Sequence, residues 1–265
     1  MHAAMAPPFL IDTHCHLDAS EFEGIRDQVV RQARLAGVRE IIVPATRLST
    51  FANTLAMRHR YGCRVAFGLH PLYLDSHCDA HLTALEQILA RENPVAVGEI
   101  GLDGFVPGLD EGRQEIVFIE QLKLARKYGL PVILHVRHAQ DRVLKFLRQQ
   151  HIEGGIAHAF NGSEQQAAAF IKLGFKLGFG GTLSFLGARR IRRLATTLPL
   201  SALVLETDAP DMRPAWAPNA PNCPANIAQF AHLLAGLRAI DDKEIALQTS
   251  QNACDALGIK TTRQG

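Results

Sequence analysis

The sequence predicts an α/β fold, a (β/α)8 TIM barrel formed by residues 1–265 as one domain. Short apolar segments alternate with longer amphipathic segments almost to the end of the chain, as in a parallel sheet whose strands are joined by helices. Eight such units fit into 265 residues, a length that is normal for one closed barrel. We see no internal repeat, low-complexity tract or linker that would divide the chain.

The apolar segments predict eight strands. In chain order they are Phe9–Asp12, Glu40–Val43, Arg64–Gly68, Val95–Gly98, Val132–Leu134, Gly155–Ala157, Lys176–Phe179 and Ala202–Leu205. The intervening segments have helical periodicity, most clearly in Gln114–Tyr128. Gly37, Gly129 and Gly174 stand where helices of this kind end on a left-handed residue. The Pro-rich stretch Pro210–Pro224 is expected to form a loop over the carboxyl end of the barrel.

Composition narrows the class of protein. The chain is 47% hydrophobic and 20% charged, which is typical of a globular protein with a large core. Its formal net charge of +2 gives no strong overall field for collecting nucleic acid, although a local basic patch is compatible with it. Five dispersed cysteines without a CxxC pair indicate a reducing compartment, so we expect a cytoplasmic protein. Residues 1–8 lack the pattern of a signal peptide, and no apolar run is long enough to span a membrane.

Six side chains that can bind metal ions follow the apolar segments. They are His14, His16, Glu99, His135, His158 and Asp208. In a (β/α)8 barrel the carboxyl ends of the strands meet at one face, and active sites are built there. The sequence therefore predicts a two-metal hydrolase site at this face.

The pair His14 and His16 follows the first predicted strand. Side chains at positions i and i+2 of a strand point to the same side, so both imidazoles can reach one cation. Cys15 points the opposite way and is expected in the core. Two surface histidines are the alternative for this motif, but a core strand has no structural use for them at its end.

Glu99 follows the fourth predicted strand, with Gly98 and Gly101 close by. A buried carboxylate is costly unless it is paired or bound to metal, and its two oxygens can bridge two cations. A helix-capping acid is the alternative for this residue. Asp103 is a weaker candidate that could orient its neighbours.

His135 and His158 are each the first polar residue after an apolar strand. One such histidine is more often a hydrogen-bonded core residue, but two on consecutive strands favour metal binding. Asp208 can bind a metal and accept a proton from water. Glu206 lies two residues earlier on the same strand face, so it is either the ligand instead of Asp208 or its partner.

Other polar residues carry weaker signals. His70 follows the third strand and is expected to contact substrate. His77 and His81 have helical spacing, for which a solvated helix start is favoured over an adventitious metal site. The basic run Arg189–Arg193 is favoured as a solvated helix face, with a phosphate-facing patch as the alternative.

Six segments resemble motifs of the TatD family of metal-dependent deoxyribonucleases, within the amidohydrolase-like TIM barrels, and look closest to its YjjV-like branch. The matching segments are Ile11–Asp18, Gly68–Pro71, Val97–Asp103, Leu130–His135, Ala157–Ser163 and Leu205–Pro210, followed by Pro221–Pro224. The resemblance runs in order along nearly the whole chain. Gly104 and Val136 depart from the residues usual in the family, which leaves the substrate preference open.

The resemblance implies two divalent metal ions per chain. The first would bind His14, His16 and Asp208, and the second His135 and His158, with Glu99 bridging the two. Imidazole-rich ligands favour zinc or manganese. The family resemblance makes magnesium a further candidate, so the sequence does not decide which metal is bound. DNA or RNA ends are the implied substrate, and neither a membrane nor an obligate protein partner is inferred.

We therefore expect a metal-dependent hydrolase, a phosphodiesterase or deoxyribonuclease that acts on nucleic-acid ends through a two-metal-activated water. Asp208 and Glu99 are the expected catalytic residues, and His70, Arg137 and Asn161 the expected substrate contacts. The alternatives are an amide or ester hydrolase of the amidohydrolase type and a TatD-like hydrolase with another substrate. Many amidohydrolases bridge their metals with a modified lysine on the fourth strand, where this chain has a glutamate. A third alternative is a binding or scaffold protein with a vestigial site. Such sites usually lose metal ligands, whereas all six candidate ligands are present in this chain.

Overall fold

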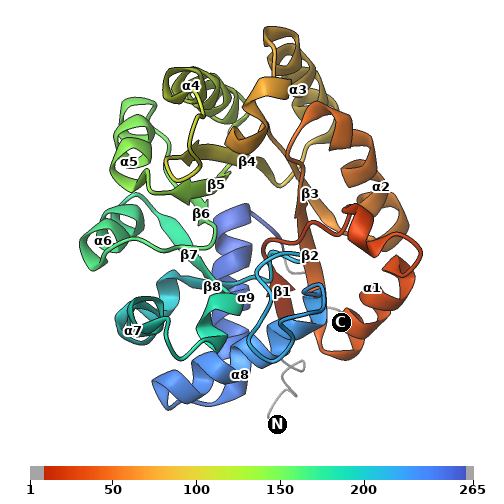
Figure 1. The fold of residues 1–265 in the computed structure, drawn as a ribbon, viewed down its shortest axis with the longest axis vertical. Helices are drawn as coiled ribbons and strands as arrows, with labels where there is room; N and C mark the ends of the chain where they lie inside the picture. The colour runs from red at the N-terminus through yellow and green to blue at the C-terminus, as the bar shows by residue number, and fades with distance from the viewer. Residues whose placement is uncertain (1–8, 261–265) are drawn as a thin grey trace.

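The computed structural model describes residues 9–260, in which eight parallel strands form one sheet in the order β1 to β8. The strands lie in a ring, and helices surround it on the outside (Figure 1). This arrangement confirms the predicted (β/α)8 barrel. The segment 1–8, for which no signal peptide is predicted, lies outside the described residues.

The strands are β1 (Leu10–Asp12), β2 (Val38–Pro44), β3 (Arg64–Phe67), β4 (Ala96–Asp103), β5 (Val132–Arg137), β6 (Gly155–Ala157), β7 (Phe175–Phe179) and β8 (Leu203–Leu205). The α-helices are α1 (Arg26–Leu35), α2 (Phe51–Tyr61), α3 (Asp79–Glu92), α4 (Glu111–Tyr128), α5 (Gln140–Gln149), α6 (Glu164–Lys172), α7 (Arg189–Thr197), α8 (Ile227–Arg238) and α9 (Asp242–Leu257). Short 3-10 turns are η1 (Ser20–Phe22), η2 (Leu48–Thr50), η3 (Pro71–Ser76), η4 (Gly181–Ser184), η5 (Leu200–Ala202) and η6 (Pro224–Asn226).

Strands β4 and β5 extend well past the carboxyl ends that their apolar residues predict. Pairing of β4 with β5 continues from Ile100 to Asp103, so Glu99 lies inside β4 and His135 inside β5 rather than just beyond the strand ends. The close approach of these strands requires a glycine, because a Cβ on Gly101 would stand 1.9 Å from the His135 carbonyl oxygen. Backbone pairing thus carries β4 and β5 past the end of the hydrophobic pattern.

Capping residues decide where helix α4 begins and ends. It starts three residues before the predicted Gln114, because the Asp110 side chain accepts a hydrogen bond from the Arg113 amide. It ends as predicted at Tyr128, followed by Gly129 with a φ of 62°. Gly37 and Gly174 also have positive φ values, as predicted for residues that follow helices.

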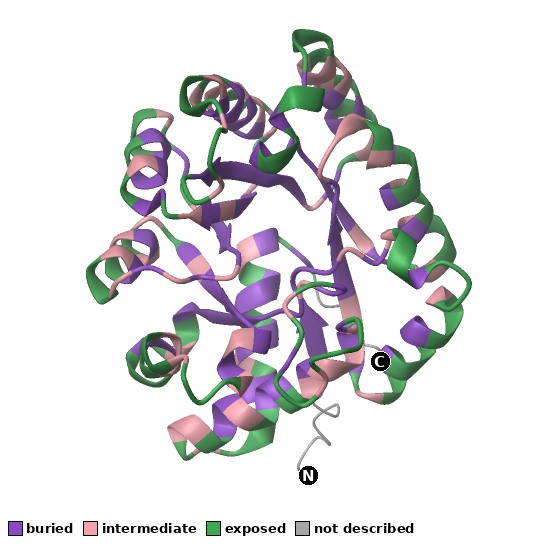
Figure 2. Cartoon of the chain, viewed as in Figure 1, coloured by how far each residue is buried: buried purple, intermediate pink, exposed green. Residues whose placement is uncertain are grey.

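The amino-terminal end of the barrel is filled by apolar side chains. Helix α9 is visible through the ring of strands in Figure 1, and its residues Ala253, Cys254 and Leu257 pack in one cluster with inward-facing strand residues such as Ile133 and Ile156. The strands are almost entirely buried (Figure 2). The carboxyl end is therefore the end left for a site. Among the described residues, no helix is both long and apolar enough to cross a membrane.

The seam between β8 and β1 is closed by the segments that follow these strands. The Thr13 amide donates to the Leu205 carbonyl at 3.1 Å, and the Asp208 amide donates to the His14 carbonyl at 2.8 Å. Cys15 forms an isolated bridge with Ala209. The residues that close the barrel are thus immediate neighbours of three predicted metal ligands.

Candidate metal centre

A cavity of about 760 Å³ opens at the carboxyl end of the barrel. Its lining contains five of the six predicted ligands, and the sixth, His14, is fully buried directly beside them. All three predicted substrate contacts also line it, namely His70, Arg137 and Asn161. The Pro-rich loop contributes Pro210, so it does lie over this end as predicted.

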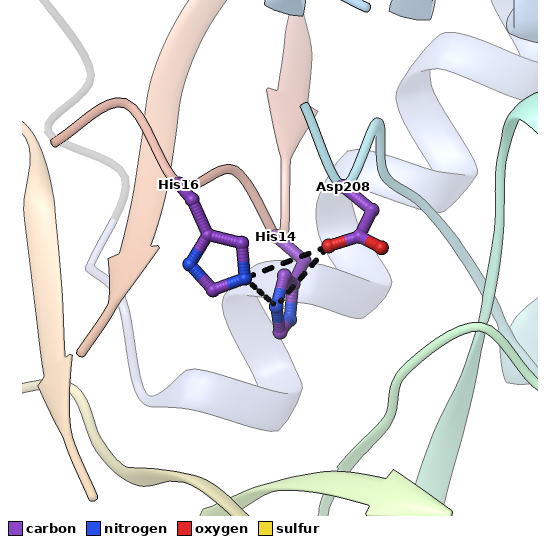
Figure 3. Close-up of side chains that lie close together, drawn as sticks. All are labelled: His14, His16 and Asp208. Atoms are coloured by element: carbon purple, nitrogen blue, oxygen red, sulfur yellow. Dashed lines mark hydrogen bonds and ion pairs between the residues drawn. The ribbon is translucent and has the colours of Figure 1, made fainter. Parts of the chain in front are cut away.

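The first group of candidate ligands is His14, His16 and Asp208, which come from opposite ends of the chain (Figure 3). The two Nε2 atoms lie 3.3 Å apart, and Asp208 Oδ1 is 3.7 Å from His14 Nε2 and 3.6 Å from His16 Nε2. Cys15 between them is fully buried, as expected. The alternation predicted for a strand therefore persists in residues 14–16, although β1 itself ends at Asp12.

Glu99 stands at the centre of the site, and its two oxygens face two sides. Oε2 lies 3.1 Å from His14 Nε2, whereas Oε1 lies 3.2 Å from His135 Nδ1 and 3.2 Å from His70 Nε2. Burial disfavours the charge, but the imidazoles of His70 and His14 outweigh it and hold the pKa of Glu99 well below its ordinary value. The helix-capping alternative is excluded because Glu99 lies within a strand.

The outer nitrogens of His16 and His135 are occupied by acceptors. His16 Nδ1 is 3.2 Å from the Pro44 carbonyl oxygen, and His135 Nε2 is 2.9 Å from Asp103 Oδ2. A nitrogen that faces an acceptor carries the ring hydrogen, so a neutral ring has its lone pair on the other nitrogen. That other nitrogen faces Glu99 in both cases, where it can hold a proton or a cation. Asp103 therefore orients His135, as the sequence suggested.

His158 has Glu206 behind it as an ion-pair partner. His158 Nδ1 is 2.9 Å from Glu206 Oε1 without the geometry of a hydrogen bond, and the same oxygen accepts a hydrogen bond from the Ala159 amide at 2.6 Å. His158 Nε2 then faces Asp208 Oδ2 at 3.6 Å. Between the two acidic residues of this segment, Asp208 faces the centre and Glu206 is its partner behind the histidine. Gly178 leaves the space for Glu206, since a Cβ there would lie 2.1 Å from Oε2.

His70 has the opposite hydrogen arrangement. Its Nδ1 accepts a hydrogen bond from the Leu72 amide at 3.1 Å, so the hydrogen of the neutral ring is on Nε2 and points at Glu99. Burial lowers the pKa of His70 to about 4, which keeps the ring neutral. Distances alone group His70 with Glu99 and His135 as possible ligands. The hydrogen on Nε2 instead makes His70 a donor to Glu99.

Asp208 is held in an unusual backbone conformation. Its φ is 56°, in the left-handed region that aspartate tolerates better than most residues. Burial disfavours its charge, but His158 outweighs this and lowers the pKa of Asp208. The ionised carboxylates and the inward-facing imidazole nitrogens together form a set of donors that fits divalent cations.

Asp12 is a functional candidate that sequence reasoning missed. Its buried carboxyl group accepts hydrogen bonds from the Thr207 hydroxyl at 2.5 Å and the Thr207 amide at 2.9 Å, and from the His14 amide at 3.3 Å. Burial raises its pKa to about 8. Asp12 thus joins the segment of His14 to the segment of Asp208. Its position in the motif Ile11–Asp18 was the available signal.

Two weaker expectations have different outcomes. His77 precedes α3 and is buried, with Nε2 2.9 Å from the His70 carbonyl, so the prediction of a solvated helix start is wrong for this residue. Its ring instead packs behind the turn that carries His70. Arg189–Arg193 begins α7 as a largely exposed face, in which Arg193 pairs with Glu164 at 3.1 Å.

Residues 11–258 match the family model described as TatD related DNase. The chain belongs to the TatD family. It is 44% identical to "Uncharacterized metal-dependent hydrolase YjjV" of Escherichia coli K12, over 89% of this chain and 93% of that protein. It is 31% identical to the mouse "Putative deoxyribonuclease TATDN3", over 92% of this chain and 86% of that protein.

The fold agrees with this assignment to the TatD family. The crystal structure of YjjV from Escherichia coli, described as a TatD homologue, superposes with a TM-score of 0.91 at 42% identity and covers 95% of this chain and 98% of that one. These matches confirm the resemblance seen in the motifs. The chain is thus a metal-dependent hydrolase of the TatD family.

Proposed function

We propose that this hydrolase is a phosphodiesterase that acts on nucleic-acid ends with two divalent metal ions. The observation that carries the proposal is the double-sided environment of Glu99, whose oxygens face two separate groups of imidazole nitrogens. The first ion would be held by His14, His16 and Asp208, and the second by His135 and His158. Glu99 would bridge the two ions.

The chain's own residues have distinct tasks in this proposal. The bound cations would supply Lewis-acid activation of water and neutralise charge on the phosphate. Asp208 is ionised and lies at the cavity wall, so it can accept the proton of the attacking water. His70 donates to Glu99 from a neutral ring and keeps this carboxylate in place.

Arg137 and Asn161 are the proposed contacts to the phosphate. Both line the cavity. The Asn161 side-chain oxygen accepts a hydrogen bond from Gln140 at 2.7 Å, which leaves its amide hydrogens free to donate. The name of the mouse relative, a putative deoxyribonuclease, supports a nucleic-acid substrate. Glutamate at the fourth strand, in place of a modified lysine, favours phosphate over carbonyl chemistry.

In the decisive test, the purified protein is supplied with manganese, magnesium or zinc. The metal-loaded protein is then assayed against 3′-labelled single-stranded DNA, RNA and a library of amides and esters. Cleavage of oligonucleotides without cleavage of amides supports the proposal. Turnover of amides alone would replace it with the amidohydrolase alternative.

Metal analysis and anomalous scattering test the two-metal arrangement separately. We expect two peaks roughly 3.5–4 Å apart on either side of Glu99. A metal soak controls for loss of the weaker ion during purification. A single peak that Glu99 does not contact would overturn the bridging role.

A further inference from the structure

Two arginines at the cavity lie over aromatic rings. Arg47 Cζ is 4.4 Å from the centre of the Tyr73 ring, and Arg137 Cζ is 3.6 Å from the centre of the Phe105 ring. Both arginines line the same cavity as Glu99. Within residues 9–260, neither forms an ion pair with an acidic side chain. Each therefore presents an uncompensated positive charge beside the metal centre.

Hydrogen bonds hold the backbone of Arg47, while its side chain has no hydrogen-bond acceptor within residues 9–260. Arg47 precedes η2, and its carbonyl accepts bonds from the Thr50 amide and hydroxyl, both at 2.9 Å. Its buried Nε has no hydrogen-bond acceptor among the described residues. A buried donor without an acceptor is costly, so this position favours an anionic partner.

The ring beneath Arg47 is tied to the backbone of His70. Tyr73 lies in η3, which begins directly after His70, and the Tyr73 amide donates to the His70 carbonyl at 3.1 Å. Tyr73 is 37% exposed as a residue, and the neighbouring Leu72 is 38% exposed. Stacking on Tyr73 holds the planar guanidinium in one orientation, which suits two parallel hydrogen bonds to a phosphate.

We propose that Arg47, seated on Tyr73, is a subsite for a phosphate other than the one that is cut. The inference rests on the proposed phosphodiesterase function and narrows its substrate class. The substrate would be a strand with at least two phosphates, rather than a simple phosphodiester. Arg137 on Phe105 serves the phosphate at the metal centre, and Arg47 serves its neighbour. The exposed Tyr73 and Leu72 offer an apolar surface for an unpaired base.

The test compares two substrates in two arginine variants. Arg47→Met removes the charge and keeps the length of the stem. Its KM for a short single-stranded oligonucleotide should rise about tenfold or more, the loss expected for a charge-assisted hydrogen bond. Its KM for bis(4-nitrophenyl) phosphate, which has one phosphate, should change no more than about twofold on the same basis. The slope of log KM against log salt should fall by about 0.7 for the oligonucleotide, as for one lost phosphate contact.

Arg142→Met is the matched control. Arg142 carries the same charge on the outer helix α5, where it pairs with Glu111 and Glu115. It should leave both KM values and the salt slope at those of the unmodified protein. Arg47→Lys should restore part of the oligonucleotide affinity, and Tyr73→Leu should raise the same KM with the charge intact. Melting temperatures establish that each variant is folded.

The outcomes separate this inference from the proposed function. If the unmodified protein cleaves oligonucleotides but Arg47→Met and Arg142→Met behave alike, the subsite is wrong and the phosphodiesterase stands. Equal rises in KM for both substrates would also overturn the subsite, because Arg47 would then serve the scissile phosphate. If the unmodified protein cleaves no phosphodiester, both proposals fail together.

Discussion

The two halves of the metal centre are built alike but held together differently. The half at β4 and β5 holds His135, with Asp103 behind it. The half at the seam of β8 and β1 holds His14, His16, Asp208 and the adjoining His158, with Glu206 behind His158. The proposed second ion would take His135 from one half and His158 from the other. Asp103 also accepts the amides of Phe105 and Val106, at 2.8 and 2.9 Å. Glu206 has one buried oxygen without a hydrogen-bond partner among the described residues.

The backbone explains this difference. The half at β4 and β5 is positioned by strand pairing that continues past His135 to Arg137. The half at the seam of β8 and β1 is positioned by loop segments and by the buried side chain of Asp12. Backbone pairing between β4 and β5 holds the candidate ligands of the first half through many hydrogen bonds. The half at the seam relies on a few long-range side-chain contacts. The seam half should therefore be the more sensitive one.

Glu99 belongs to both halves, so its loss should have the largest effect. In Glu99→Gln the side chain keeps its shape but loses the charge that would bridge two cations. We expect turnover to fall by about a thousandfold, since each cation contributes several kcal/mol to the transition state. Metal analysis should show fewer than two ions per chain. Retention of two ions and normal turnover would show that the halves are independent of Glu99.

Asp208→Asn should damage the seam half alone. The amide is a poor base, so turnover should fall at least about a hundredfold, while folding is nearly unchanged. The ion at His135 should stay. Steady-state kinetics and metal counting on the same sample measure both effects. Near-normal turnover would show that another residue is the general base, and Glu206 would be the first candidate to test.

Asp12→Ala and Asp103→Ala compare the supports of the two halves directly. Each variant removes a carboxyl group that accepts hydrogen bonds from three donor groups. Both should weaken metal binding in their own half by roughly 10- to 100-fold.

The stability of the metal-free variants should separate these two supports. Asp12→Ala should lower the free energy of unfolding by at least about 2 kcal/mol, because it leaves buried donors unpaired at the seam. Asp103→Ala should lower the free energy of unfolding by less, because the backbone pairing of β4 with β5 remains. Denaturant unfolding of both proteins is the measurement. Equal losses of unfolding free energy in the two variants would contradict the proposed difference between a half held by strand pairing and a half held by side-chain contacts.

Proton release from His135 and His158 on metal binding is the smallest expected effect. Burial disfavours the charged ring, but Asp103 and Glu99 outweigh it for His135, as Glu206 and Asp208 do for His158, so both pKa values are raised. A raised pKa means that the metal-free protein holds these protons near neutral pH and that a cation must displace them. Metal affinity should therefore rise with pH, because both rings must release a proton when the second ion binds. Calorimetry in buffers of different ionisation enthalpy counts the protons, and a count of zero near pH 7 would refute this account.

The sequence by itself predicted the barrel and the positions of its candidate ligands. Apolar periodicity is local, so it reveals strands and helices, and their alternation brings all strand ends to one face. His135 and Glu99 could be found in this way because each follows an apolar run. Their positions inside longer strands could not be predicted from the sequence, because the backbone pairing of β4 with β5 does not depend on hydrophobic side chains.

Only the tertiary structure decided the roles of residues whose partners are distant in the chain. Asp12 bonds to Thr207, 195 residues away, and no local pattern encodes that contact. The hydrogen on His70 is placed by the turn that follows it, which makes this histidine a donor to Glu99. Arg47 meets Tyr73 because the β2 and β3 loops converge at the cavity. Local spacing identifies a chemical group, whereas hydrogen-bond direction and stacking are set by the neighbours that folding brings to it.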